Sequence, residues 1–375
     1  MDARTHGVTR STLGRDRGHP GRRWGSPARH PCRMAAGTTL PVHPPVTAPR
    51  SGAATGAEPR LADPTTLASL RSDQAPWPGR TVTAGGVSLH VRETPGDPGT
   101  EAVYVHGLAG SATNWTDLAG LLGTRATGLS VDLPGFGLSE PTASRDFTPD
   151  GMADALLCWL AGRGRPVHLV GNSLGGLICM TVAARRPELV RTLTLVSPAM
   201  PDLRPDPRRL SDPRMALAMV PVLGRGARRA LAAEPLRSRA ERIVKVCFAD
   251  PQRGSERRLE ELIAEHEHRA TLPWAAEASD GATRGLLAVW AGRTAWQRAS
   301  RVRVPTLVVW GGADRVVTPK LARRTASALD AGLLVLPETG HVAQIERPEA
   351  VARAVAGLWD GGSTGIGEDG GDPVR

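Results

Sequence analysis

The stretch Val167-His168-Leu169-Val170-Gly171-Asn172-Ser173-Leu174-Gly175-Gly176 decides the fold of this 375-residue chain. An apolar run with strand character enters the pattern Gly-x-Ser-x-Gly, and a segment of small and apolar residues with helical character follows, up to residue 186. Strand, sharp turn and helix in this order present a serine hydroxyl above the edge of a sheet. Glycines flank the serine because a side chain there would collide with the strand or the helix. A tight turn with an idle serine has the same pattern, so the rest of the chain must distinguish the two interpretations.

Further apolar runs with strand character alternate with helical segments on both sides of this stretch. Two alternating runs around Gly85-Gly86 predict a hairpin. Strands that are apolar on both faces and alternate with helices predict an α/β fold with a mostly parallel sheet covered by helices. The expected strands are 80–83, 87–91, 103–105, 127–131, 167–170, 193–196, 306–310 and 333–336, and the expected helices are 114–122, 152–160, 177–186, 318–329 and 348–358.

The alternation stops between about residues 201 and 301. This segment is rich in arginine, favours helix and contains Trp274, Trp290 and Trp296. It predicts a helical insertion over the carboxyl ends of the strands, where open α/β sheets bind their ligands.

The two ends of the chain differ in composition from the middle. Residues 1–78 are rich in Pro, Gly and Arg without a helical or strand period, which predicts a disordered basic tail, and the Gly- and Asp-rich residues 361–375 predict a flexible one. The net charge is +10, but twelve Arg and five acidic residues give residues 1–80 a charge of +7, which leaves +3 for the rest. Because the basicity belongs to a tail and no nucleic-acid-binding motif is present, we expect no nucleic-acid partner.

Several other classes are disfavoured as well. The cysteines show no spacing typical of a metal site or of disulfides, which predicts no metal and a cytoplasmic location. No apolar run reaches the roughly 18 residues that span a bilayer, and no signal peptide is predicted. Gly135-Phe136-Gly137 lacks the third glycine of a dinucleotide-binding turn, and we expect no cofactor. Nothing in the sequence indicates the oligomeric state. The four cysteines are Cys32, Cys158, Cys179 and Cys247.

Two polar residues downstream of Ser173 complete a catalytic pattern. Asp314 comes just past the apolar run 306–310, and His341 comes just past the next run, 333–336. Serine hydrolysis needs a nucleophile, a base and a group that orients the base, and in this architecture they follow the chain order Ser, acid, His. An isolated Asp or His after glycine is most often an ordinary loop residue, but all three in order, each after a strand, predict a catalytic triad.

The expected roles follow from this order. His341 accepts the proton of Ser173 as general base, and Asp314 orients the imidazole and stabilises its cationic form. Two backbone N–H groups are needed for the oxyanion, and we predict those of Leu174 and Leu108. His106 is a second possible base, but we favour a structural role in which it holds its loop by hydrogen bonds.

These segments resemble the α/β-hydrolase superfamily over about residues 80–360. The resemblance implies an eight-stranded, mostly parallel sheet in a domain of residues 79–360, with a helical lid after the sixth strand at about residues 201–301. The matching motifs are His-Gly-x-x-Gly (106–110), Asp-Leu-Pro-Gly-Phe-Gly-x-Ser (132–139), Gly-Asn-Ser-Leu-Gly-Gly (171–176), Gly-x-x-Asp (311–314) and Gly-His-x-x-x-x-Glu (340–346).

The resemblance also separates branches of the superfamily. Epoxide hydrolases and haloalkane dehalogenases use Asp at the position of Ser173, and epoxide hydrolases need lid tyrosines, whereas the sole tyrosine, Tyr104, precedes the oxyanion loop. Carbon–carbon hydrolases of meta-cleavage products share the Gly-Asn-Ser turn, but they usually carry Trp where this chain has Val342.

The leading hypothesis is a serine hydrolase that cleaves a carboxylic ester or related acyl bond of a small, fairly apolar substrate through an acyl-enzyme. A carbon–carbon hydrolase or an acyltransferase with the same triad is the alternative. A ligand-binding protein without catalysis is the third interpretation.

Overall fold

The eight predicted strands form one sheet in the order β1-β2-β4-β3-β5-β6-β7-β8. The computed structural model describes residues 56–71, 73–202, 226 and 234–361, so most of both predicted tails lies outside it. β1 and β4 pair antiparallel with β2, and every other neighbouring pair is parallel. The predicted mostly parallel α/β sheet is therefore confirmed. Its strands are β1 (Gly79–Ala84), β2 (Val87–Thr94), β3 (Glu101–Val105), β4 (Thr127–Val131), β5 (Val167–Asn172), β6 (Val190–Val196), β7 (Thr306–Gly311) and β8 (Gly332–Leu336).

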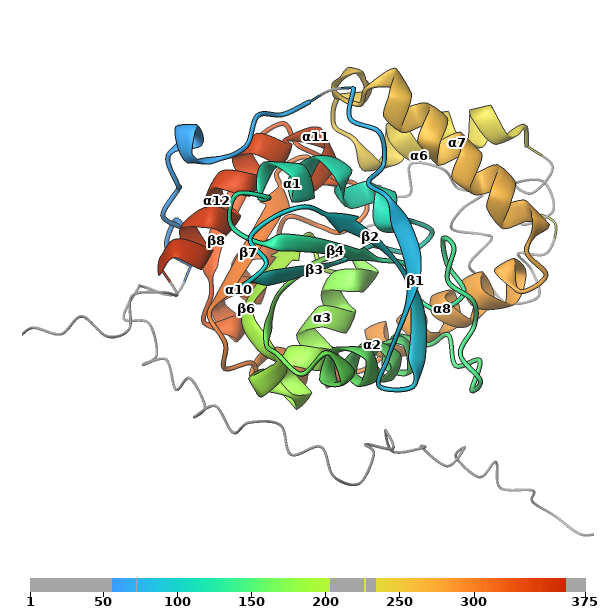
Figure 1. Ribbon diagram of the computed structural model, residues 1–375, viewed down its shortest axis with the longest axis horizontal. Coiled ribbons are helices and arrows are strands. Elements are labelled where there is room, and N and C mark those ends of the chain that lie inside the picture. Colours follow the sequence, from blue (N-terminus) through green and yellow to red (C-terminus); the bar gives the residue numbers. More distant parts are fainter. Residues whose placement is uncertain (1–55, 72, 203–225, 227–233, 362–375) are drawn as a thin grey trace, which may run out of the picture.

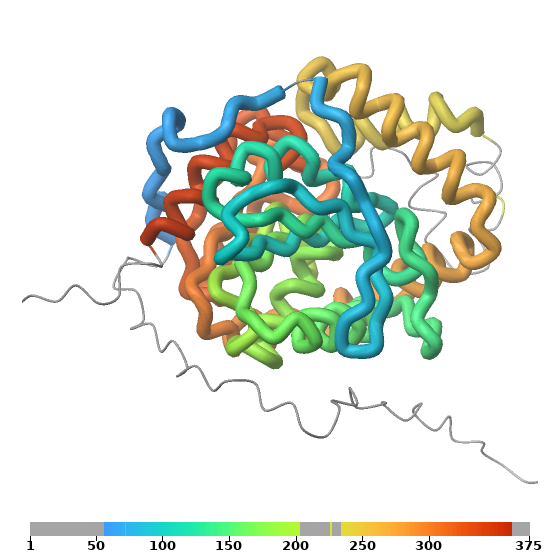
Figure 2. Tube along the Cα trace, in the orientation of Figure 1, coloured from blue at the N-terminus to red at the C-terminus, as the bar shows by residue number. Residues whose placement is uncertain are grey.

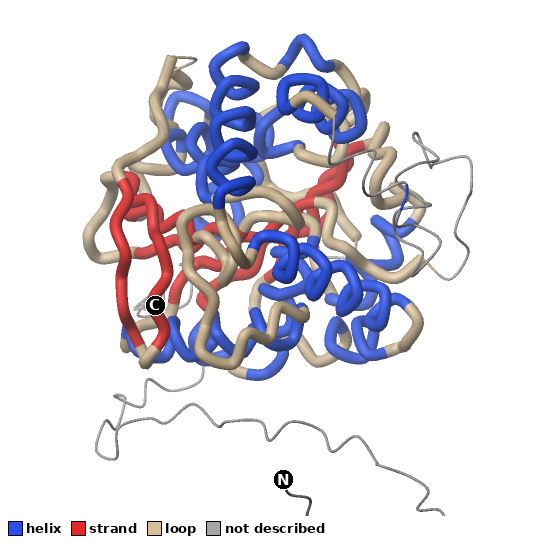
Figure 3. The backbone as a smooth tube through the Cα atoms, turned by 90° about the vertical axis from the view of Figure 1, so that its right-hand side faces the viewer, coloured by secondary structure: helices blue, strands red, loops and turns tan. Residues whose placement is uncertain are grey.

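Helices cover both faces of the sheet (Figures 1 and 3). α1 and α12 pack together over one face, and α2 and α3 pack together over the other. The helices of these layers are α1 (Thr116–Leu121), α2 (Pro149–Arg163), α3 (Leu174–Arg185), α10 (Leu321–Leu329), α11 (Ala343–Glu346) and α12 (Pro348–Gly361), and the short 3₁₀ helices are η1 (Pro64–Thr66), η2 (Ala112–Trp115) and η3 (Pro187–Leu189).

Neighbouring residues of one strand belong to two separate apolar cores. In β3, Val105 packs with the core on the α2 and α3 side, while Tyr104 packs with the core on the α1 and α12 side. In β7, Val308 and Val309 divide in the same way. Successive side chains of a strand point to opposite faces, so a strand covered on both sides needs apolar residues throughout. This explains why the central strands read as continuous apolar runs.

The segment before β1 lies along the domain, beside α12 (Figure 2). Ala62 is buried, and its N–H donates to Arg353 O of α12. Further along, the Trp77 indole N–H donates to Thr116 O at 2.9 Å. The ordered domain thus begins before the predicted boundary at residue 79, and the prediction of disorder is wrong for the described residues between 56 and 78. These contacts rely on backbone hydrogen bonds and isolated side chains, which leave no periodic pattern in the sequence.

The described residues between β6 and β7 are mainly helical. Two of these helices, α6 and α7, pack together and lie at one end of the sheet, whereas α8 packs on α2, and α9 packs on α3 (Figure 1). No helix in the described part of the chain has the length and apolar character needed to cross a bilayer. Residues 203–225 and 227–233 of the predicted insertion lie outside the described residues. The helices are α6 (Leu236–Cys247), η5 (Pro251–Arg253), α7 (Glu256–Thr271), α8 (Ala275–Trp290) and α9 (Thr294–Ala299).

Candidate active site

Ser173 occupies the sharp turn between β5 and α3. Its φ is +53° and its ψ is −117°, a combination that L-residues other than glycine rarely adopt. Neighbouring backbone groups hold it there: its N–H donates to Val196 O at 3.0 Å, and its carbonyl accepts from Ala199 N at 2.9 Å. Strained backbone of this kind persists only where the surrounding structure fixes it, and it is concentrated at functional sites.

The two glycines of the Gly-x-Ser-x-Gly turn have no room for a side chain. A Cβ on Gly175 would lie 2.3 Å from Val105 O and 2.4 Å from His106 O, and a Cβ on Gly171 would lie 2.6 Å from Gly175 O. These neighbours are backbone atoms of β3, its following loop and α3, and they cannot rotate away. The close approach of α3 to the sheet therefore requires both glycines, as the sequence predicted.

Asp314 and His341 form a buried pair beyond the ends of β7 and β8. His341 Nδ1 lies 2.9 Å from Asp314 Oδ2, and the Asp314 side chain has no exposed surface. Asp314 Oδ1 accepts from the N–H groups of Val316 and Val317 at 2.8 and 2.9 Å. The carboxylate is thus fixed by its own loop, and its other oxygen favours the imidazole tautomer with the proton on Nδ1. That tautomer leaves His341 Nε2 able to accept a proton.

Asn172 connects the serine turn to the histidine loop. Its side-chain N–H₂ donates to Val196 O at 3.0 Å and to His341 O at 3.1 Å. Within the described residues, the Ser173 hydroxyl forms no hydrogen bond with His341 Nε2. Such contacts are often long in structures without substrate and shorten when substrate binds. The structure therefore brings Asp314 and His341 into direct contact and joins Ser173 to them through the neighbouring asparagine.

Glu346 fixes the histidine loop through four hydrogen bonds. Oε2 accepts from Gly340 N at 2.7 Å and from Ala249 N at 3.2 Å. Oε1 accepts from Asp250 N at 3.1 Å and from the Arg253 guanidinium at 3.2 Å. Three of these donors belong to the segment between α6 and α7, so Glu346 joins the histidine loop to the helical insertion. The sequence showed this glutamate only as the end of a motif and gave it no role.

The end of α6 also contacts His341 directly. The N–H of His341 donates to Cys247 O at 2.6 Å. Burial, and next to it the charge of Asp314, raises the pKa of the Cys247 thiol to about 12. This thiol therefore stays protonated and does not compete with Ser173 as a nucleophile.

The predicted oxyanion donors lie on a turn and at a helix start. Gly110 N–H donates to Gly107 O at 3.1 Å, and Ala109 has a φ of +61°, as expected for a type II turn. Leu108 is the second residue of this turn, and Leu174 is the first residue of α3, where N–H groups have no acceptor inside the helix. Neither N–H has an acceptor among the described residues.

His106 holds the loop that carries Leu108 from within. Its Nε2 accepts from Leu133 N–H at 3.0 Å, so Nδ1 carries the proton and contacts Gly107 O at 2.7 Å. Burial lowers the pKa of His106 and keeps the ring neutral. Both ring nitrogens are engaged in structure, which agrees with the structural role that the sequence favoured over that of a base.

Asp132 is a second structural centre for the same loop. Its Oδ1 accepts from Ala112 N, and its Oδ2 accepts from Leu138 N and contacts His90 Nδ1 at 2.8 Å. Burial alone would raise its pKa, but these hydrogen bonds keep it below the usual range. A Cβ on Gly137 would lie 2.2 Å from this carboxyl group. The glycine after Phe136 is therefore the sequence signal for this buried carboxylate.

Comparisons with known proteins agree with this architecture. Residues 102–354 match the alpha/beta hydrolase family. A dihydrolipoyllysine-residue acetyltransferase component of an acetoin cleaving system from Pseudomonas putida is 30% identical over 285 residues, which cover 75% of this chain and 69% of that protein. A putative lipase structure from Acinetobacter baumannii AYE superposes with a TM-score of 0.64 at 20% identity, covering 77% of this chain and 93% of the lipase.

A 2-hydroxy-6-oxo-6-phenylhexa-2,4-dienoate hydrolase structure from Rhodococcus sp. strain RHA1 superposes with a TM-score of 0.62 at 22% identity and covers 76% of this chain and 98% of that one. At this level of identity the two solved structures establish the fold alone. Among the described residues, no cluster of His, Cys, Asp or Glu could hold a metal ion. The family match extends from β3 into α12 and includes every motif of the candidate site, so this chain belongs to the alpha/beta hydrolase family.

Proposed function

We propose that this protein is a serine hydrolase that cleaves a carboxylic ester or related acyl bond of a small, fairly apolar substrate. The observation that carries the proposal is the buried hydrogen bond between Asp314 and His341, on the loop tied by Asn172 to the turn of Ser173. A buried carboxylate that orients an imidazole beside a strained serine is the arrangement that nucleophilic acyl transfer requires.

The reaction proceeds in two acyl transfers. Ser173 Oγ attacks the substrate carbonyl carbon while His341 Nε2 takes the hydroxyl proton, and Asp314 stabilises the imidazolium that results. The N–H groups of Leu108 and Leu174 donate to the oxyanion. The intermediate collapses, the ester C–O bond breaks, and His341 returns the proton to the leaving alcohol. Water then attacks the acyl-enzyme by the same route and releases the acid and free Ser173.

The helical insertion acts in this proposal as a lid that limits access to the site. Support comes from its hydrogen bonds with the histidine loop: His341 N–H donates to Cys247 O, and residues 249, 250 and 253 donate to Glu346. A lid that excludes water strengthens the electrostatic interactions with the transition state.

Turnover of p-nitrophenyl esters of increasing acyl length tests the proposal. Ser173→Ala should reduce kcat to the background rate while binding remains, and a fluorophosphonate probe should label the natural protein but not the variant. Full activity in Ser173→Ala would refute the assignment. A protein that only binds ligands would be labelled in neither form.

A carbon–carbon hydrolase is the second candidate. Structural similarity to a hydrolase of a meta-cleavage product favours it, and the Gly-Asn-Ser turn is compatible with it. Val342 stands where those enzymes usually carry Trp, which favours the ester reaction. Loss of the visible absorbance of a meta-cleavage product, at a rate above that of ester turnover, would favour this alternative. Transfer of the acyl group to an added alcohol or thiol would indicate an acyltransferase.

A further inference from the structure

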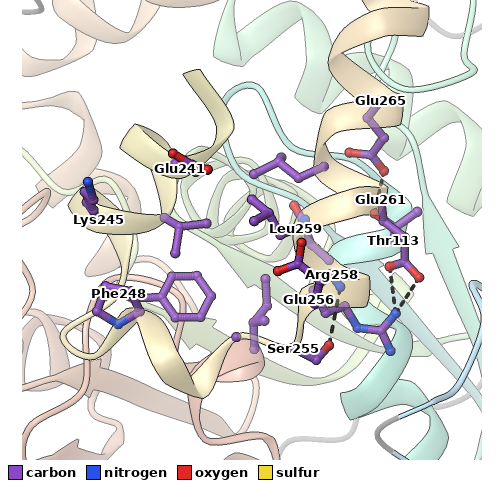
Figure 4. A pocket seen from close by; sticks show the side chains of 16 residues that line it. Thr113, Glu241, Lys245, Phe248, Ser255, Glu256, Arg258, Leu259, Glu261 and Glu265 are labelled. Atoms are coloured by element: carbon purple, nitrogen blue, oxygen red, sulfur yellow. Dashed lines mark hydrogen bonds and ion pairs between the residues drawn. The ribbon is translucent and has the colours of Figure 1, made fainter. Parts of the chain in front are cut away.

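Helix α7 of the insertion contacts the oxyanion loop through one carboxyl group. Glu265 Oε1 accepts hydrogen bonds from the hydroxyl groups of Ser111 and Thr113, the latter at 2.5 Å. These partners lie more than 150 residues away in the sequence, so the contact joins two distant segments. Figure 4 shows Glu265 and Thr113 joined at one end of a cavity, with Lys245 at the opposite end.

Ser111 and Thr113 determine how the chain leaves the loop that carries Leu108. Ser111 follows the turn 107–110 directly and caps η2, because its hydroxyl oxygen accepts from Thr113 N–H at 3.1 Å. Its own N–H donates to Asn114 Oδ1 at 3.3 Å, which completes a capping box. By binding both hydroxyl groups, the Glu265 carboxyl therefore restrains the end of the turn that contains Leu108.

The cavity beside Glu265 has a volume of about 220 Å³ and lies between α6, α7 and η2. Neither Ser173 nor His341 is among the residues that line it. Its apolar lining comes mainly from Val244, Phe248, Leu259, Leu262 and Ile345.

The Glu265 carboxyl changes its charge state near neutral pH. Burial is the largest influence and raises its pKa to about 7, although the hydrogen bonds from Ser111 and Thr113 act in the opposite direction. Of the more distant charges, Asp132 at the end of β4 raises the pKa, and Arg92 of β2 lowers it. The remaining charged groups that line the cavity are Glu241 and Lys245 of α6 and Glu256, Arg258 and Glu261 of α7, of which Arg258 pairs with Glu261 and with Asp117 of α1.

We infer that Glu265 is a positioning residue for the proposed ester hydrolysis: by holding Ser111 and Thr113 it keeps Leu108 N–H directed at the oxyanion. The inference rests on the proposed function, because it concerns a donor of that reaction. The ionised carboxyl accepts a hydrogen bond from each of the two hydroxyl groups. The protonated carboxyl carries an O–H donor of its own beside them. The loop is therefore held best when Glu265 is ionised.

The experiment compares Glu265→Leu, which has no acceptor, with Glu265→Gln, which keeps a carbonyl oxygen without a titration. Glu260 is exposed on the same helix, so Glu260→Leu and Glu260→Gln are matched controls. We expect Glu265→Leu to lower kcat about tenfold, with KM changed less than about threefold, because an oxyanion donor acts mainly in the transition state. Glu265→Gln should restore kcat to within about threefold of the natural protein.

The pH profile separates positioning from a purely structural role. Ionisation of Glu265 favours activity, so the ratio of kcat in the natural protein to kcat in Glu265→Gln should fall from about three above pH 7 to about one below it. A ratio that stays constant with pH, or equal kcat in Glu265→Leu and Glu260→Leu, would overturn the inference. If Glu265→Leu fails to fold, the pH dependence of the ratio decides.

A Ser111→Ala variant, alone and combined with Glu265→Leu, tests the route of the effect. If Glu265 acts through this hydroxyl, the combined loss in kcat will be smaller than the product of the single losses, whereas independent losses would multiply and count against the inference. Ser173→Ala distinguishes the two proposals. Retained turnover there refutes the hydrolase itself. An inactive Ser173→Ala with fully active Glu265→Leu refutes only the role of Glu265.

Discussion

Replacing Glu346 by glutamine changes the charge of a buried group without changing its shape. The side chain has no exposed surface, and its two oxygens accept four hydrogen bonds. In Glu346→Gln one oxygen becomes an N–H₂ group. Whichever way the amide is oriented, that group faces two N–H donors and can accept from neither.

The expected cost follows from the bonds that are lost. A hydrogen bond to a charged group contributes about 1.5–3 kcal/mol, and a buried donor left without an acceptor costs about 1–3 kcal/mol. Two lost acceptor positions, partly relieved by local movement, thus correspond to about 3–5 kcal/mol. This is a large share of the roughly 5–15 kcal/mol by which folded domains are stable.

Urea unfolding of natural and variant protein measures this quantity. The midpoint should fall with an unchanged slope, because the surface exposed on unfolding is the same. The exposed Glu349, three residues further along, supplies the matched control Glu349→Gln. Since Gly340 precedes His341 and binds Glu346, ester turnover should fall as well. A loss of stability no greater than that of Glu349→Gln would refute the assigned role of the four hydrogen bonds.

Three further changes test other parts of the structure. Asp314→Asn should lower kcat for an ester about 10³- to 10⁴-fold with little change in KM, since the imidazole loses its orienting carboxylate; near-normal kcat would argue against the triad. Gly175→Ala should prevent folding to a soluble protein, because the new Cβ would lie 2.3 Å from Val105 O, and a cooperative unfolding transition near that of the natural protein would contradict this. Burial raises the pKa of Glu265 from 4.5 to about 7, so the folded state binds a proton more tightly and loses stability as the pH rises through this range. Glu265→Gln should therefore gain up to about 3 kcal/mol relative to the natural protein between pH 4.5 and 8, and parallel stability–pH curves would exclude the shift.

The sheet was predictable because the residue pattern that specifies each strand lies within that strand. Strands covered on both faces are apolar throughout, and Tyr104 and Val105 show why, since each belongs to a different core. The turn at Ser173 was predictable for the same reason, because its glycines are required by atoms close to the turn. Asp314 and His341 followed from chain order and from their places after two such strands.

The contacts between distant segments were not predictable. α7 carries Glu256, Glu260, Glu261, Glu265 and Glu267, and nothing in their neighbours distinguishes the one that reaches Ser111. The ordered segment before β1 is held by backbone hydrogen bonds and by isolated side chains such as Trp77, which leave no periodic pattern. Such features depend on which surfaces the fold brings together, and a single sequence has no periodic signal for them.

The helical insertion forms hydrogen bonds both with the histidine loop and with the residues that follow the Leu108 turn. It supplies hydrogen-bond donors to Glu346 and an acceptor, Cys247 O, to His341, so the histidine loop depends on the end of α6. It also supplies the carboxyl of Glu265 to Ser111, at the end of the loop that carries Leu108. The Asp314–His341 bond itself needs no group from the insertion. A displacement of α6 and α7 would therefore break hydrogen bonds to both loops at once, whereas it would break none between Asp314 and His341.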